Sequence, residues 1–87
     1  MLEQRIVIVN RLGLHARAAA KLVRAASSYQ SSVRLERTDG GSVADAKSIL
    51  SVLLLAASRG TELRLTVEGA DEAEALGAVC ALIREGF

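Results

Sequence analysis

Residues 12–20 read LGLHARAAA, and the spacing of the apolar side chains changes within this stretch. Before it, Ile6 to Val9 form a β-branched run that predicts a strand over residues 2–9. After it, apolar residues recur at helical spacing on one face and basic residues recur on another, which predicts a helix over residues 16–28. The change from strand to helix predicts a domain in which helices pack against a sheet.

The remaining chain alternates between strand and helix patterns in the same way. Strands are expected over residues 32–37, 42–44 and 62–68. Asp39-Gly40 predicts a tight turn between the first two of them. A second helix is expected over residues 45–58, and Asp71 with Glu74 three residues later predicts a capping-box start for a third. The side chains of this third helix that we expect to face inward are Ala73, Leu76, Val79, Cys80 and Ile83.

The order β-α-β-β-α-β-α favours an α+β, two-layer fold, with helices on one face of a largely antiparallel sheet. With 87 residues, we expect a single domain over residues 1–87. Eleven Lys and Arg against ten Asp and Glu leave almost no net charge, which argues against a nucleic-acid partner. The lone Cys80 excludes an intrachain disulfide, and we expect it to pack in the core.

Several features that would indicate other classes of protein are missing from the sequence. It has no glycine-rich phosphate loop, no obvious carboxylate pair and no metal-ligand spacing, so we expect no metal, no cofactor and no self-contained enzyme. The N-terminal residues lack a signal-peptide layout, and the longest apolar run, Val52–Ala57, is too short to cross a bilayer. We therefore expect a cytoplasmic protein without membrane insertion.

His15, the only histidine, stands at the start of the first predicted helix. No Ser, Thr, Asp or Asn between Arg11 and Ser27 is available to cap that helix, so the amides of Ala16, Arg17 and Ala18 are left for an anion. His15 with Arg17 fits a covalent phosphoryl-carrier site, but the spacing alone favours a poor N-cap beside a solvated arginine.

The second predicted helix contains KSILSVLLL at residues 47–55 and is apolar almost all round. A helix on a two-layer domain needs only one apolar stripe, so part of Ile49, Leu50, Leu53 and Leu54 is expected to be exposed. Such a patch marks a partner surface, unless it is deep core or a homodimer contact. Ser48 is a candidate cap or a site for a regulatory phosphate, and Asp45 is a rival cap.

Three classes of function remain open on these residues alone. The first is a phosphoryl carrier that uses His15, and the second is a regulatory module that binds a small effector near the helix start. The third is an interaction domain that dimerises through its apolar helix. The His15–Arg17 pair at an uncapped helix favours the first class, and the excess of apolar surface fits the first and the third.

Motifs along essentially the whole chain resemble the HPr family, the histidine phosphocarriers of the bacterial phosphoenolpyruvate-dependent phosphotransferase system. They are Gly13-Leu14-His15-Ala16-Arg17, Lys47-Ser48-Ile49-Leu50, Gly60, Gly69 and Asp71-Glu72 with Ala75. The resemblance implies an open-faced β-sandwich with strand order 1-4-2-3 and three helices. It also implies that enzyme I phosphorylates His15 on Nδ1, that Arg17 stabilises the phosphoryl group, and that an enzyme IIA domain receives it.

The resemblance further implies a monomer with a shared docking face and a regulatory site. Ser48 matches the serine that HPr kinase/phosphorylase modifies in lineages that have that enzyme. The expected docking residues are Ala20, Lys21, Arg24, Lys47, Ile49, Leu50 and Leu53. The sequence departs from the family at Ala18, where proline is usual, and this restores one N–H that would point into the anion site. Sugar uptake and a nitrogen-related regulatory branch both remain open.

Overall fold

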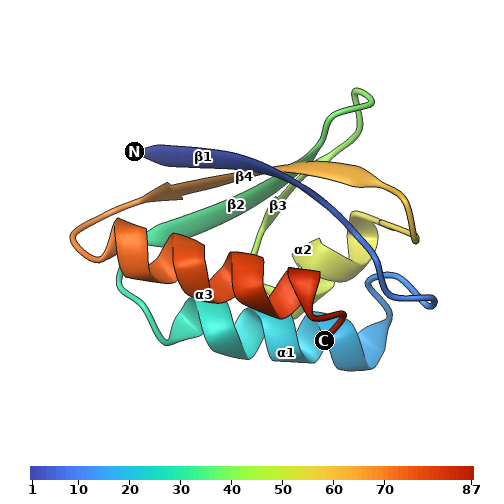
Figure 1. Cartoon of the computed structure of the whole chain (residues 1–87), viewed down its shortest axis with the longest axis horizontal. Helices are drawn as coiled ribbons and strands as arrows, with labels where there is room; N and C mark the ends of the chain where they lie inside the picture. Colours follow the sequence, from blue (N-terminus) through green and yellow to red (C-terminus); the bar gives the residue numbers. More distant parts are fainter.

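The strand predicted over residues 62–68 lies in the interior of the sheet, with a neighbouring strand on each side. In the computed structural model, which describes residues 1–87, the elements are β1 (Leu2–Val7), α1 (Ala16–Ser27), β2 (Ser32–Arg37), β3 (Val43–Asp45), α2 (Ile49–Leu54), β4 (Glu62–Glu68) and α3 (Glu72–Arg84). All strand pairs are antiparallel, and the sheet order is β1-β4-β2-β3. Figure 1 shows the three helices below one face of this sheet, while the other face is open. The predicted fold class and strand order are confirmed.

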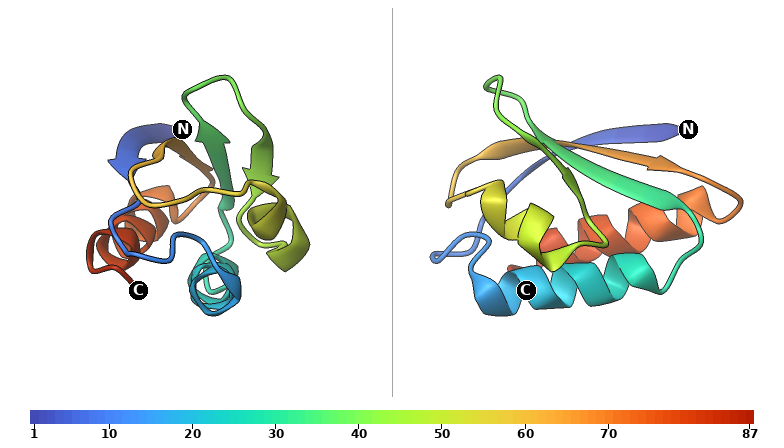
Figure 2. Two further views of the ribbon diagram at one scale, coloured as in Figure 1. Left: turned by 90° about the vertical axis from the view of Figure 1, so that its right-hand side faces the viewer. Right: turned by 180° about the vertical axis from the view of Figure 1, so that it is seen from behind.

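The core lies between the inner face of the sheet and the helices, and it is almost entirely aliphatic. Leu63, Leu65 and Val67 of β4 are fully buried and alternate with polar residues on the outer face. The helices α1 and α3 bury small residues toward the sheet, together with Leu22 and Ile83. Because α1 and α3 lie side by side under the strands, this layer covers the whole central part of the sheet (Figure 2).

The second helix differs from its prediction at both ends. The sequence pattern predicted residues 45–58, whereas α2 covers only Ile49–Leu54. Its start is displaced because Asp45 ends β3, and Ser48 provides the N-cap. Its end comes early because Ala56 has a φ of +54°, which an α-helix cannot accommodate. The sequence predicted a longer helix because Leu55 and Ala57, which lie outside α2, are also buried and continue its apolar pattern.

The start of α3 also differs from its prediction. Asp71 is the N-cap residue, but its carboxylate makes no cap hydrogen bond, so the predicted capping box is wrong. The carboxylate instead accepts hydrogen bonds from the amides of Gln30 and Ser31, both at 2.9 Å, and from the Ser31 hydroxyl at 2.5 Å. The contact joins the α1–β2 connection to the β4–α3 connection.

Two smaller corrections concern inward-facing residues and a strand end. Ala73 is exposed and Leu76 is only half-buried, because Ala75, Val79, Cys80 and Ile83 form the buried stripe of α3. The first strand was predicted over residues 2–9 and ends at Val7. Ile8 continues to pair beyond this end, since its amide donates to the carbonyl of Thr61 at 3.0 Å.

Candidate functional site

A tightly held loop places His15 at the start of α1. Gly13 has a φ of +66°, and a Cβ atom there would lie 2.6 Å from the carbonyl oxygen of Ala57. The next amide, that of Leu14, donates to the same oxygen at 2.9 Å. On the other side, the Asn10 side-chain amide donates to the carbonyl of Gly13 at 2.6 Å. The position of His15 is therefore set by the segment that follows α2.

His15 is the N-cap residue of α1, and its ring does not perform the capping. Its backbone is extended, its side chain makes no cap hydrogen bond, and its carbonyl accepts from Ala19 at 2.8 Å. The amides of Ala16, Arg17 and Ala18 have no hydrogen-bond acceptor, and the first turn contains no acidic residue. A half-exposed imidazole thus stands beside three free N–H groups and the positive end of the helix dipole.

The neighbouring residues of α1 present a basic and solvent-accessible surface. Arg17 and Arg24 are exposed and make no ion pair, and Ala20 is exposed between them. The ammonium of Lys21 donates to the carbonyl of Phe87 at 2.7 Å. Ala18 is different, because the whole residue is buried, with 0% exposure. Its amide therefore lies beneath the surface of the site, whereas Ala16 and Arg17 are exposed.

The predicted excess of apolar surface on α2 is confirmed. Val52 faces the core, whereas Ile49, Leu50 and Leu53 are exposed. Leu54 is the most exposed of the group at 70% and was missing from the expected docking residues. Its exposure agrees with the expectation from the apolar pattern of the predicted helix. The helix α2 packs beside α1, which carries the basic residues (Figure 2).

Lys47 and Ser48 lie at the start of α2, and both have structural contacts. The ammonium of Lys47 donates to the carbonyl of Tyr29 at 2.8 Å, so it fastens the α2 start to the end of α1. The hydroxyl of Ser48 accepts from the amide of Ser51 at 3.4 Å, which confirms its predicted capping role. Asp45 is not the cap, since its carboxylate accepts from the Lys47 amide at 2.9 Å.

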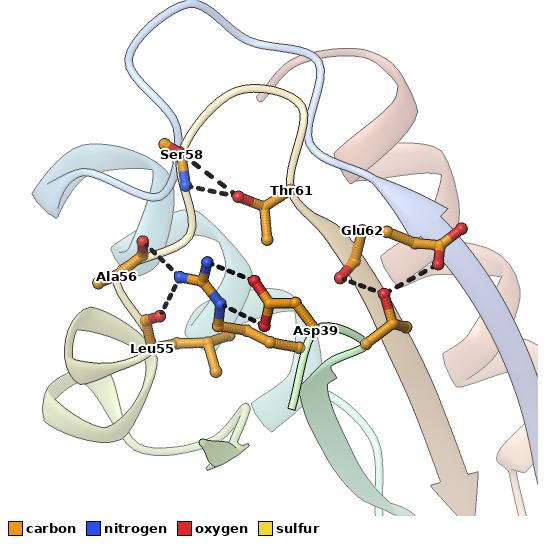
Figure 3. Close-up of polar contacts among 8 residues, drawn as sticks. Asp39, Leu55, Ala56, Ser58, Thr61 and Glu62 are labelled. Carbon is orange, nitrogen blue, oxygen red and sulfur yellow. Dashed lines mark hydrogen bonds and ion pairs between the residues drawn. The ribbon is translucent and has the colours of Figure 1, made fainter. Parts of the chain in front are cut away.

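Sequence reasoning missed an arginine that fastens the other end of α2. Arg37 donates through Nη1 to the carbonyls of Leu55 (3.2 Å) and Ala56 (3.0 Å). Its Nε and Nη2 atoms donate to both oxygens of Asp39, at 3.1 and 2.8 Å (Figure 3). Hydrogen bonding and charge attraction raise the pKa of Arg37 and lower that of Asp39. The alternation of the strand was the available signal in the sequence. Arg37 is two residues after Leu35 and four after Val33, and both of these face the inner side of the sheet.

The remaining candidates add no second site. No group of three or more His, Cys, Asp and Glu side chains is arranged to hold a metal ion. None of the helices has the length and apolar character needed to span a bilayer. Cys80 is buried, as expected, and burial raises the pKa of its thiol.

A half-exposed imidazole and free amides at a helix start together offer hydrogen-bond donors to an anion. The family model described as "PTS HPr component phosphorylation site" matches residues 2–85. The chain therefore belongs to the HPr family of phosphocarrier proteins of the phosphotransferase system. Its predicted resemblance to that family is confirmed.

Individual relatives and solved structures agree with this assignment. The chain is 48% identical over 87 residues to a phosphocarrier protein HPr of Xylella fastidiosa, covering 100% of this chain and 96% of the relative. It is 41% identical over 85 residues to a phosphocarrier protein NPr of Klebsiella oxytoca, covering 98% and 93%. HPr-C-His from Thermoanaerobacter tengcongensis aligns with a TM-score of 0.93 at 40% identity, covering 100% and 96%. An HPr dimer from the same organism aligns with a TM-score of 0.75 at 40% identity, covering 98% and 95%.

Proposed function

We propose that His15 carries the phosphoryl group, accepting it on Nδ1 from a phosphohistidine of enzyme I and passing it to a histidine of an enzyme IIA domain. The observation that carries this proposal is the uncapped start of α1, where three amides without acceptors lie beside the half-exposed imidazole. A phosphoryl group on His15 supplies the acceptor oxygens that the helix start lacks. Family membership supports the same assignment.

Each transfer forms one N–P bond as another breaks. The imidazole nitrogen of His15 attacks the phosphorus, and the nitrogen of the donor histidine leaves with its electron pair. Charge spreads over the three equatorial oxygens in a loose transition state, so catalysis depends on position and charge. The free amides, the helix dipole and the guanidinium of Arg17 compensate that charge. The chain thus acts as a carrier between two enzymes and needs neither metal nor cofactor.

The docking face combines the exposed apolar residues of α2 with the basic surface of α1. Ala20, Lys21, Arg24, Ile49, Leu50 and Leu53 belong to it, and Leu54 extends it. Lys47 contributes through its stem, because its ammonium is held by Tyr29. We assign this function to one domain that works as a monomer in the cytoplasm, where both partner enzymes act. Sedimentation at working concentration tests the monomer, since a structural relative is a dimer.

Ser48 is the proposed regulatory site, modified by HPr kinase/phosphorylase where the host has that enzyme. It is half-exposed at the start of α2 and directly precedes exposed Ile49. A phosphate would add a charge of about −2 beside the apolar docking face and weaken partner binding. Acid-stable label from ATP with a competent kinase, absent in Ser48→Ala, is the expected result. No label on the native protein would leave Ser48 as a cap only.

The carrier proposal is tested by incubation with phosphoenolpyruvate and enzyme I. An acid-labile, alkali-stable phosphate is expected on the native protein and not on His15→Ala. Absence of label on the native protein refutes the proposal, and label that survives His15→Ala moves the site elsewhere. Chase with separate enzyme IIA domains then distinguishes sugar uptake from a regulatory branch, since relatives described as HPr and as NPr both match.

A further inference from the structure

Arg37 is hydrogen-bonded to the segment that follows α2, residues 55–58. This 55–58 segment is in turn hydrogen-bonded to the loop before His15. The guanidinium of Arg37 donates to the carbonyls of Leu55 and Ala56, directly after α2, at 3.2 and 3.0 Å. Asp39 holds the other side of the guanidinium through two hydrogen bonds, which fixes its orientation (Figure 3). A cation at this end of a helix is also favoured by the helix dipole.

The β2–β3 turn supports the side chain of Arg37 from the other side. A Cβ atom at Gly41 would lie 2.6 Å from Cδ of Arg37, so the turn backbone packs directly on the aliphatic stem. The turn is attached to β4 as well, because the Thr38 hydroxyl donates to the carboxylate of Glu62 at 2.9 Å (Figure 3). Arg37 therefore joins the end of α2 to the sheet.

The connection to His15 runs through two consecutive carbonyls. The carbonyl of Ala56 accepts from Arg37, and the carbonyl of Ala57 accepts from the amide of Leu14 at 2.9 Å. Ala56 adopts a φ of +54°, a left-handed conformation that is unfavourable for a non-glycine residue. Such a conformation persists only where the surroundings hold it. Arg37 provides that restraint, and buried Leu55 and Ala57 provide the rest.

We propose that Arg37 is a positioning residue for phosphoryl transfer, acting on His15 through Ala56, Ala57 and Leu14. The inference rests on the proposed function and adds a residue of β2 that never touches the phosphoryl group. Without Arg37, the 55–58 segment relaxes, and the loop that sets the His15 backbone loses its fixed support. Misplacement of a reacting group by about 1 Å can slow a reaction by about 10²-fold, so partial loosening of this loop reduces kcat measurably.

The test compares Arg37→Met, Arg37→Lys and the control Arg64→Met. Arg64 is a comparably exposed arginine that also pairs with carboxylates, but it lies on the outer face of the sheet and has no contact with the His15 loop. Methionine retains the packing of the stem and removes the donors. Two quantities are measured for each protein: hydrogen exchange of the Leu14 amide relative to β4 amides, and kcat and KM for phosphoryl transfer from phospho-enzyme I.

In Arg37→Met, exchange at Leu14 should accelerate about tenfold relative to β4 amides, which reports local and not global opening. The value of kcat should fall about three- to tenfold, with KM changed less than about twofold. Arg37→Lys should recover part of both effects, since an ammonium can reach one carbonyl but cannot make the paired contact with Asp39. Arg64→Met should change neither quantity.

Three results would overturn the assignment. They are equal acceleration of Leu14 and β4 amides, faster Leu14 exchange with unchanged kcat, and an effect confined to KM. The last would assign Arg37 to partner docking through α2. A native protein that accepts no phosphate refutes the carrier function and the assignment together. The exchange data then report the Arg37–Leu14 connection alone, so the two failures are distinguishable.

Discussion

The close approach of the loop at Gly13 to the segment after α2 can be tested by adding a single methyl group. Gly13 and Gly60 both have positive φ values, +66° and +89°. A Cβ atom at Gly13 would meet the carbonyl oxygen of Ala57 at 2.6 Å and Cα of Ser58 at 2.8 Å, whereas one at Gly60 would meet nothing within 4 Å. Gly60→Ala therefore measures backbone strain alone, and Gly13→Ala measures strain plus steric overlap.

The expected magnitudes follow from these two contributions. Left-handed backbone costs alanine about 1–2 kcal/mol, and the lower entropy of the unfolded chain returns about 0.4–1 kcal/mol. Gly60→Ala should therefore lower the free energy of unfolding by about 1 kcal/mol. Overpacking adds about 1–3 kcal/mol, so Gly13→Ala should lower it by about 2–4 kcal/mol.

Urea denaturation of both variants and the native protein provides the measurement, with equal m-values as the check that unfolding remains comparable. In Gly13→Ala, the hydrogen bond between the Leu14 amide and the Ala57 carbonyl should also weaken, with faster exchange of that amide. Equal losses of stability in the two variants would refute the reasoning. They would mean that Gly13 is needed for its backbone angle and not for the contact between the two segments.

Three further predictions concern single side chains. Arg17→Ala should slow phosphoryl transfer by at least about tenfold while changing the free energy of unfolding by less than about 1 kcal/mol, because Arg17 is exposed and makes no ion pair. A large loss of stability with normal transfer would contradict its role. Hydrogen bonds from Ser31 and the Gln30 amide hold the pKa of Asp71 below its ordinary value. The stability that Asp71 contributes is therefore present above about pH 4 and is lost as the pH falls through the lower folded-state pKa. Urea midpoints at acidic and neutral pH should show a smaller difference in Asp71→Asn, and an unchanged difference would remove Asp71 from the acid response. Ala18→Pro removes one free amide at the phosphoryl site, so it should shorten the lifetime of phosphohistidine, measured as the rate of label loss. An unchanged lifetime in a variant of native thermal stability would exclude that amide as a donor.

The spacing of apolar residues predicts correctly those elements in which one face is buried and the other is exposed. The strand around Leu65 alternates strictly, and α1 has one apolar stripe, so both could be predicted with small boundary errors. The second helix could not, because Leu55 and Ala57 are buried by tertiary contacts outside the helix and imitate a helical continuation. Asp71 was misread for a related reason. Its hydrogen-bond partners are 40 or more residues away in the sequence, beyond the reach of a local capping pattern.

The candidate site also has one part that the sequence predicts and one part that it does not. The uncapped start of α1 could be predicted at His15, because a missing cap is a local property of the sequence. The contacts that fix this start could not be predicted, since Leu14 is held by Ala57 and the segment after α2 is held by Arg37. These contacts depend on which strands become neighbours. The exposure of Leu54, by contrast, was predicted from the apolar character of its own helix and is confirmed.

The sheet order also affects how the chain acquires its function during synthesis. β1 pairs only with β4, and Leu2 faces Val67. During synthesis β1 therefore remains unpaired until β4 has been made. Until β4 has emerged, Ile8, which leads into the loop before His15, cannot pair with Gly60 and Thr61. Contacts this distant in sequence form slowly. A nascent or truncated chain therefore exposes His15 without its support, and competence for phosphoryl transfer coincides with completion of the fold.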